Sequence, residues 1–266
     1  MEIAGRSAVV TGAGSGIGRA CARSLAALGA SVLVADVDAD GAQDTVSAIT
    51  GVGGDATLAV VDVRRPEDLS TMFDVATDCF GGVDILCNNA GIVCGEPLWP
   101  ATDPERLMSQ VMVNLGAVVL GTRLAVDRLG PRGGGAVVNV ASIGALLPLE
   151  DEPGYSATKA GVVMFTRACA ALARTHGIRV NAVLPALVDT PLLAKSGDGT
   201  NEAPWALQAR AILPLLSPDD VAAAVVDLVH DDALAGHCRI VGELPDFVAA
   251  MISSEGGSWT QSLSPT

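Results

Sequence analysis

The chain has 266 residues, of which 50 % are apolar and only 3 % aromatic, and its formal net charge is −14. This length suits one α/β domain, and no linker or block of charge divides the sequence. Nucleic acids and anionic membranes need a basic surface, so the charge argues against both as partners; the alternative is that it serves solubility alone.

The N-terminal residues have neither the basic nor the apolar region of a signal peptide, and polar residues interrupt every long apolar run. We therefore expect a cytoplasmic protein without a membrane span. The six cysteines form no CxxC pair, which predicts reduced thiols rather than disulfides. The histidines His176, His230 and His237 stand apart from any cysteine pair, so we expect no metal site.

Seven short apolar runs along the chain are typical of buried parallel strands. They cover residues 7–11, 31–35, 58–61, 83–87, 136–140, 178–184 and 238–241. Helical stretches separate them, which predicts an α/β fold: a single-domain, Rossmann-type, doubly wound parallel sheet with helices on both faces. We expect this domain to comprise residues 1–252, and the Ser/Gly/Thr-rich residues 253–266 to form a flexible tail.

A glycine-rich turn follows the first strand, with the sequence Thr11-Gly12-Ala13-Gly14-Ser15-Gly16-Ile17-Gly18. Glycines let a backbone approach phosphates closely, and a helix N-terminus offers free N–H groups at the positive end of its dipole. The turn therefore predicts a dinucleotide pyrophosphate site. Its expected contacts are Gly12, Ser15, Gly16, Ile17 and Gly18. The spacing departs from GxGxxG, and a strand-helix corner without a ligand is the alternative.

Asp36 closes the second strand, 18 residues beyond Gly18. A carboxylate at this position can accept hydrogen bonds from an adenosine ribose and repel a 2′-phosphate. NAD is therefore expected rather than NADP. The alternative is that Asp36 only caps or solvates the strand end.

The helical stretches 110–124 and 155–173 are apolar around more than one face. One face can cover the sheet, and the other needs a second partner. We therefore expect a homo-oligomer with these helices at its interface; the alternative is a monomer in which both are buried.

The only tyrosine, Tyr155, precedes Lys159, one of two lysines, by four residues. On a helix these positions share one face, and a nearby cation favours the ionised phenol and lowers its pKa. The pair predicts an acid/base device. The alternative is a helix residue with a polar tip beside a solvated surface charge.

These motifs, together with Asn88-Asn89-Ala90-Gly91 after the fourth strand, resemble those of the short-chain dehydrogenase/reductase family over roughly residues 5–242. The resemblance implies an NAD-dependent enzyme that interconverts a secondary alcohol and a ketone by hydride transfer. It further implies that Tyr155 is the general acid/base, that Lys159 supports it, that Ser142 holds the substrate oxygen and that Asn114 holds a relay water. Asn114 as a helix-bending core residue and Ser142 as a turn residue are the alternatives.

Cofactor contacts also follow from the resemblance. They are Asp62 and Val63 for adenine, Asn89, Ala90 and Gly91 along the cofactor site, Pro185, Val188 and Thr190 for the nicotinamide amide, and Tyr155 and Lys159 themselves. Asp62 as a helix cap or turn former is the alternative. Two positions depart from the family pattern. Ala186 replaces the usual glycine and must avoid positive φ. Residues 239–245 replace the usual C-terminal strand motif, and because that part of the family's chain often builds tetramer contacts, a dimer is as plausible as a tetramer.

Loops 93–99, 143–154 and 187–215 are expected to form the substrate site, with 192–213 as a lid. Their leucines and Trp205 predict an apolar small-molecule substrate, with cyclic alcohols and ketones among the candidates; ordinary packing is the alternative. Two other functions are alternatives. A reductase of carrier-bound or polyketide ketones is disfavoured by Asp36 and the acidic charge, and a catalytically silent dinucleotide-binding regulatory protein by the complete set of four catalytic candidates.

Overall fold

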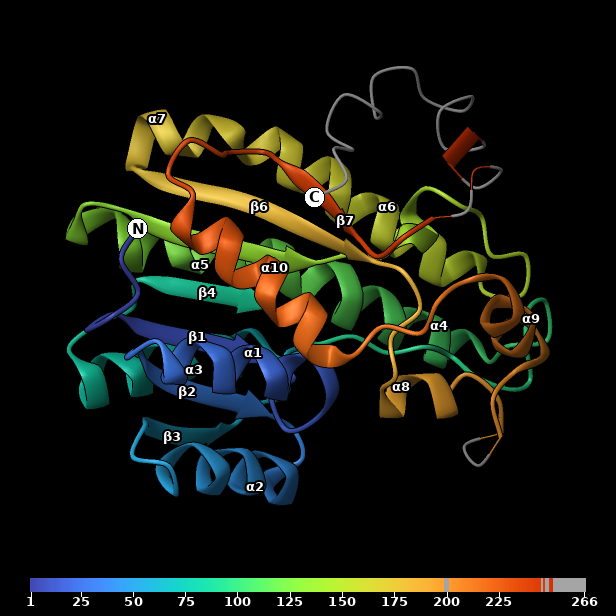
Figure 1. Cartoon of the computed structure of the whole chain (residues 1–266), viewed down its shortest axis with the longest axis horizontal. Helices are drawn as coiled ribbons and strands as arrows, with labels where there is room; N and C mark the ends of the chain where they lie inside the picture. Colours follow the sequence, from blue (N-terminus) through green and yellow to red (C-terminus); the bar gives the residue numbers. More distant parts are fainter. Residues whose placement is uncertain (199–200, 245, 247–248, 251–266) are drawn as a thin grey trace.

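A computed structural model describes residues 1–198, 201–244, 246 and 249–250 of the chain. Within this part, seven parallel strands form one sheet in the order β3-β2-β1-β4-β5-β6-β7 (Figure 1). The strands are β1 (Ser7–Thr11), β2 (Ser31–Asp36), β3 (Asp55–Val60), β4 (Ile85–Asn88), β5 (Gly135–Val140), β6 (Ile178–Pro185) and β7 (Cys238–Val241). The predicted fold class is confirmed. The tail expected at 253–266 lies outside the described residues.

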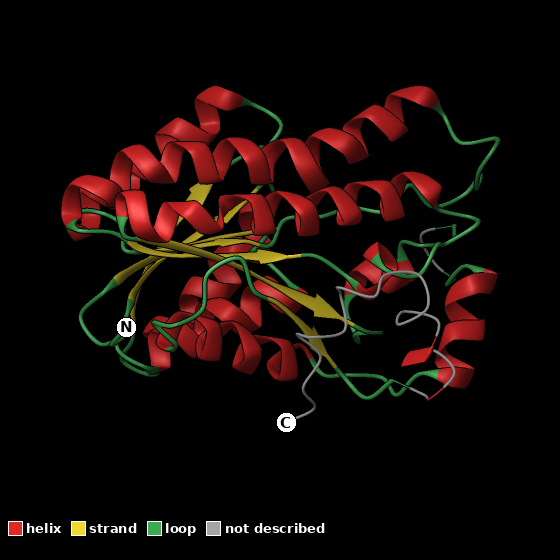
Figure 2. Cartoon of the chain, turned by 90° about the horizontal axis from the view of Figure 1, so that it is seen from above, coloured by secondary structure: helices red, strands yellow, loops and turns green. Residues whose placement is uncertain are grey.

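Ten α-helices have both ends within the described residues. They are α1 (Gly16–Ala27), α2 (Ala39–Thr50), α3 (Pro66–Phe80), α4 (Pro104–Val111), α5 (Ala117–Leu129), α6 (Pro153–Ala168), α7 (Leu172–His176), α8 (Pro191–Ala194), α9 (Pro204–Ile212) and α10 (Pro218–His230). Figure 2 shows helices on both faces of the sheet.

Side chains along each strand point alternately to the two faces of the sheet, so the apolar core is divided between these faces. In β1, Ala8 and Val10 pack with residues of α1 and α10, whereas Val9 packs with residues of α3 and α5. Successive side chains of a strand point to opposite faces, so a continuous apolar run fills both cores. This burial fixes the register of the central strands and leaves their carboxyl ends at one edge.

The edge strand β3 differs from its prediction. It begins at Asp55 rather than residue 58 and ends at Val60 rather than 61. Asp55 and Val60 are exposed, because β3 pairs only with β2 in the described sheet and is partly open to solvent. A search for buried apolar runs therefore misses the polar start of this strand.

Helices α4 and α5 are joined by a π-helical turn, η1 (Met112–Gly116), into one helical stretch, Pro104–Arg132. Its length and composition would suffice to cross a membrane, but 44 % of its apolar window is buried in the protein. α5 packs against β4 and β5. These properties suit a helix that covers the sheet of a folded domain.

Several large apolar side chains on α4, η1, α5 and α6 nevertheless face outward. They are Met108, Met112, Val119 and Met164, all exposed. Val118, Val162 and Val163 on the same helices are buried against the sheet. The second apolar face expected from the sequence is therefore present, and the subunit interface on it stays a prediction.

Candidate active site

The candidate site lies at the carboxyl ends of the central strands. The strand order reverses between β1 and β4, which is where open α/β sheets bind ligands. The glycine-rich turn follows β1, residues 89–91 follow β4, Ser142 follows β5, and the segment Ala186 to Thr190 follows β6. The fold thus brings the predicted segments to one edge.

The glycine-rich turn leaves the start of α1 available to an anion. Gly12 and Gly16 have φ angles of 64° and 50°, in the left-handed region that favours glycine. The N-cap residue, Ser15, makes no side-chain capping bond, and the first turn of α1 has no acidic residue. Unsatisfied N–H groups and the helix dipole therefore point toward one place, and these residues fit a dinucleotide pyrophosphate.

Hydrogen bonds lock this turn to the segment after β4. The Thr11 hydroxyl oxygen accepts from the backbone N–H groups of Asn89 and Ala90 at 3.0 and 3.1 Å. The Asn89 amide donates to the carbonyls of Thr11 and Gly12 at 2.9 and 3.1 Å. The two predicted cofactor segments therefore form one rigid wall.

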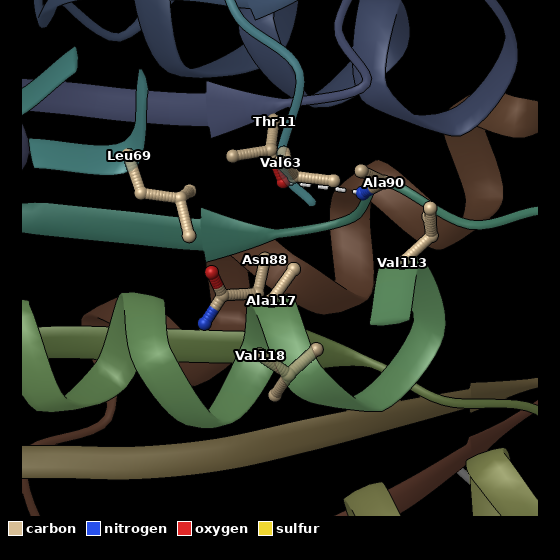
Figure 3. A pocket seen from close by; sticks show the side chains of 8 residues that line it. All are labelled: Thr11, Val63, Leu69, Asn88, Ala90, Val113, Ala117 and Val118. Atoms are coloured by element: carbon tan, nitrogen blue, oxygen red, sulfur yellow. Dashed lines mark hydrogen bonds between the residues drawn. The ribbon is translucent and has the colours of Figure 1, made fainter. Parts of the chain in front are cut away.

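A narrow pocket opens beside this wall (Figure 3). It is lined by Thr11, Val63, Leu69, Asn88, Ala90, Val113, Ala117 and Val118. Val63 and Ala90, which the sequence predicts as cofactor contacts, are among the lining residues, and so are Thr11 and Val113, which the sequence did not single out as contacts. Thr11 is the last residue of the first strand, and this position could have indicated that it borders the site. No pattern in the sequence predicts the π-helical turn that carries Val113.

Asp36 lies at the end of β2 and is directed at the glycine-rich turn. Its carboxylate accepts from the N–H of Gly14 at 2.7 Å and from that of Asp38 at 2.9 Å. The Arg19 side chain lies beside the same turn, where it donates to the Gly14 carbonyl and, at 3.0 Å, to the Thr45 hydroxyl. A carboxylate and a guanidinium thus flank the expected adenosine site.

Asp62 lies just after β3 and is held by a residue that the sequence did not point to. Arg64 forms an ion pair with its carboxylate at 2.6 Å and holds the pKa of Asp62 below its usual value through that hydrogen bond. Arg64 also donates to the Ser109 hydroxyl at 3.2 Å. The Asp62 carboxylate is therefore partly engaged by Arg64.

Tyr155 and Lys159 share one face of α6, as predicted. The Lys159 Nζ lies 5.6 Å from the centroid of the Tyr155 ring and donates to the Val140 carbonyl at 2.8 Å. Lys159 is only 4 % exposed, and Tyr155 is partly buried. The alternative of a solvated surface lysine is therefore wrong.

The prediction that the pKa of Tyr155 is lowered is wrong. Burial raises the pKa of Tyr155, and the neighbouring Ser142 side chain offsets part of the rise. Burial also lowers the pKa of Lys159 to about 8. Loss of hydration disfavours the charged form of each group and is the largest cause of both shifts.

Ser142 and Tyr155 converge beside Gly144. A Cβ added to Gly144 would lie 3.4 Å from Ser142 Oγ and 3.5 Å from Tyr155 Cε1. Ser142 Oγ also accepts from the Gly144 N–H at 3.0 Å. The hydroxyl and the phenol ring therefore border the same small space.

Asn114 lies in the π-helical turn and is fully buried. Its Oδ1 accepts from the Ile92 N–H at 2.8 Å, and its Nδ2 donates to the Ile92 carbonyl at 2.9 Å and to the Thr158 hydroxyl at 3.3 Å. A Cβ added to Gly91 would lie 3.5 Å from Lys159 Nζ and 3.6 Å from Asn114 Oδ1. The structure thus brings Asn114, Lys159 and Gly91 together.

The segment after β6 folds over the glycine-rich turn. A Cβ added to Gly16 would lie 3.1 Å from Thr190 Cγ2. Pro185 ends β6, and Val188 is buried and pairs with Leu216. Ala186 has no positive φ, as expected, and its N–H donates to the Val241 carbonyl at 2.9 Å.

Helices α8 and α9 form the predicted lid region beyond the carboxyl ends of the strands (Figure 1). Its apolar cluster contains Leu187, Leu193, Trp205, Ala206, Ala209 and Leu213. Much of this apolar surface packs within the cluster itself, so ordinary packing accounts for part of the leucine content.

Fold and site together define a dinucleotide-binding oxidoreductase, and comparison with known proteins agrees. The model of the short chain dehydrogenase family matches residues 6–201, and the chain belongs to this family. Its activity is therefore on CH–OH groups.

Three known proteins illustrate the similarity. The chain is 36 % identical over 226 residues to cyclohexanol dehydrogenase of Acinetobacter sp., covering 85 % of this chain and 88 % of that protein. It is 34 % identical over 249 residues to 15-hydroxyprostaglandin dehydrogenase [NAD(+)] of Bos taurus, covering 89 % and 90 %. The structure of 7α-hydroxysteroid dehydrogenase complexed with NADH and 7-oxoglycochenodeoxycholic acid superposes with a TM-score of 0.82 at 29 % identity, covering 92 % and 97 %.

Proposed function

We propose that the protein is an NAD-dependent dehydrogenase that interconverts an apolar secondary alcohol, including cyclic ones, and the corresponding ketone. The observation that carries this proposal is the convergence of Ser142 with Tyr155, and of Lys159 with Asn114, beside the residues that we expect to hold the dinucleotide. The apolar lid cluster supports an uncharged substrate. Relatives named for cyclohexanol and for a hydroxysteroid support the cyclic class.

The proton chemistry follows from the chain's own residues. When bound, the nicotinamide supplies or accepts the hydride. Because burial raises the pKa of Tyr155, its phenol is protonated in the unliganded protein and is ready to donate a proton to a ketone oxygen. Alcohol oxidation needs the ionised phenol and is therefore favoured by mildly alkaline pH. Ser142 would hold the substrate oxygen as its charge changes.

Lys159 and Asn114 would support this proton transfer. With a pKa of about 8, Lys159 can gain or lose a proton near neutrality. Asn114 fixes the backbone at Ile92 through two hydrogen bonds and lies next to the lysine across Gly91. We propose that these groups, with a water held by Asn114, return the proton to solvent.

The proposed preference for NAD rests on Asp36. Its charge lies against the Gly14 N–H, where a ribose 2′-phosphate would meet a like charge. Arg19 is the opposing feature, but its donors are directed at backbone carbonyls and the Thr45 hydroxyl. Relatives whose names include NAD(+) or NADH support the same choice.

A screen of secondary alcohols with NAD and with NADP, read by absorbance of the reduced cofactor at mildly alkaline pH, tests this function. We expect turnover of apolar cyclic alcohols with NAD and much weaker turnover with NADP. Preference for a dianionic substrate, or equal use of NADP, would contradict the proposal.

We also propose that the outward apolar face of α4, α5 and α6 joins two or four copies of the chain. Met164, which is exposed on α6, lies on this face. Light scattering of wild type and Met164→Glu should show an oligomer for the former and smaller particles for the latter. A monomeric wild type would refute the proposal.

A further inference from the structure

A buried carboxyl group lies three residues before Tyr155 and has no place in the proposed chemistry. Glu152 is 3 % exposed and is the N-cap residue of α6. Its Oε1 accepts from the Gly95 N–H at 3.1 Å, and its Oε2 accepts from the Gln110 amide at 3.3 Å. One side chain therefore ties loop 93–99 and α4 to the start of the helix that carries Tyr155.

Loop 93–99 in turn contacts the base of the lid. The Glu96 N–H donates to the Gly197 carbonyl at 3.0 Å, and Arg106 donates to the Glu96 carbonyl at 2.8 Å. A Cβ added to Gly95 would lie 2.7 Å from the Lys195 carbonyl oxygen, so the two backbones touch. Glu152 is thus the inner end of a chain of contacts from α6 to the lid.

The charged and titratable groups around Glu152 come from three directions. Arg106 of α4 attracts it, the buried Cys94 thiol lies on the loop side, and Tyr155 lies one turn further along α6. Burial raises the pKa of Glu152, and the negative charge of Glu152 contributes to the raised pKa of Tyr155. Asp151, the preceding residue, is partly buried, and Glu150, two residues before Glu152, is exposed.

Gln110 offers Glu152 a second hydrogen-bonding arrangement. Its Oε1 is buried and has no hydrogen-bond partner among the described residues. A half-turn of the amide would direct this oxygen toward Glu152, which could then donate a proton to it when neutral. The pocket of Glu152 can therefore accommodate both the ionised and the neutral carboxyl group.

We propose that Glu152 is a positioning residue that holds loop 93–99 against the catalytic helix and, through its charge state, sets the pH range in which Tyr155 acts as a base. The inference rests on the proposed role of Tyr155. An ionised Glu152 opposes ionisation of the phenol, so alcohol oxidation begins at a higher pH than it would beside a neutral group.

The test compares wild type, Glu152→Gln and Glu150→Gln in alcohol oxidation, with kcat/KM measured against pH. Glu152→Gln keeps an acceptor for Gly95 and removes the buried charge, whereas Glu150→Gln makes the same chemical change on an exposed side chain. We expect the acidic limb of the Glu152→Gln profile to move to lower pH, with about threefold higher kcat/KM on that limb. The midpoint of the Glu150→Gln profile should stay at its wild-type pH, because the charge of this exposed side chain is screened by water and salt.

A third variant, Glu152→Ala, removes the acceptor as well as the charge. We expect Glu152→Ala to be less thermally stable than wild type and to have a higher KM. Glu152→Gln should keep thermal stability and KM close to the wild-type values. The midpoint of a pH profile does not depend on how much enzyme is folded, so it separates the charge effect from a merely structural one.

The inference is overturned if the Glu152→Gln profile coincides with wild type, or if Glu150→Gln shifts it equally. Tyr155→Phe, measured in parallel, keeps the two proposals distinguishable. An active Tyr155→Phe enzyme refutes the acid/base role itself, whereas an inactive one with an unmoved Glu152→Gln profile refutes only the role of Glu152.

Discussion

Replacing Lys159 with methionine should stabilise the fold while it stops turnover. Burial lowers the pKa of this lysine from 10.5 to about 8, and this difference corresponds to roughly 3 kcal/mol. The folded protein carries this destabilisation wherever the ammonium is protonated. Methionine removes it but also leaves the Val140 carbonyl without its donor, which costs about 1–2 kcal/mol. We therefore expect a net gain in unfolding free energy of about 1–2 kcal/mol at pH 7.

The sign of the pH dependence provides a second check. Because the folded pKa lies below the unfolded one, the unfolded state binds more protons between about pH 8 and 10.5. Wild-type stability should therefore rise relative to Lys159→Met as the pH increases, by about 2 kcal/mol between pH 7 and 9.5. Groups other than Lys159 are the same in both proteins, so their contributions cancel in the difference.

Urea unfolding followed by circular dichroism at the two pH values measures both effects. Lys195→Met is the matched control, because Lys195 is the other lysine of the chain and is exposed. Its stability should stay within about 0.5 kcal/mol of wild type at both pH values. A Lys159→Met protein that is less stable than wild type at pH 7, or a gap that does not change with pH, would refute the reasoning.

Three further substitutions test individual roles. Asp36→Asn should raise the ratio of kcat/KM with NADP to kcat/KM with NAD by about tenfold or more, since it removes the charge that opposes a 2′-phosphate. Asp38→Asn, which changes the nearby N-cap residue of α2, should leave this ratio near the wild-type value. Equal ratios for the two variants would count against the assignment of Asp36 to the ribose. Ser142→Ala should lower kcat/KM by about 10²-fold or more, whereas Ser156→Ala, which removes a hydroxyl that also accepts a loop N–H, should have little effect; similar losses would mean that Ser142 only shapes the loop. Asn114→Ala should reduce kcat while the NADH dissociation constant changes by less than about threefold, and an unchanged kcat would remove it from the proton path.

Most of the sheet could be predicted because burial on both faces leaves a signal in the sequence. β1 and β7 have the predicted bounds, whereas β4 begins at Ile85 rather than at residue 83. The π-helical turn around Asn114 could not be predicted. Asn114 within this turn hydrogen-bonds to Ile92, which is 22 residues away, and a local sequence pattern does not show such a contact. The expected cytoplasmic location stays a prediction.

The candidate site could be assembled from the sequence, but its electrostatics could not. The end of the second strand indicated Asp36, helical spacing indicated the Tyr155 and Lys159 pair, and the family resemblance indicated Ser142 and Asn114. The pKa of Tyr155 was predicted in the wrong direction, because spacing shows which charges are near and not how much water is lost. The ion pair between Arg64 and Asp62 was missed for a similar reason, since side-chain orientation is set by the fold.

The most direct test of the account is Tyr155→Phe, measured for both turnover and cofactor binding. The change removes one hydroxyl and keeps the ring beside Lys159 and Gly144. We expect kcat for an accepted alcohol to fall by about 10³-fold or more, while the NADH dissociation constant, measured by fluorescence titration, changes by less than about threefold. Turnover within about tenfold of wild type would contradict the assignment of Tyr155 as the acid/base.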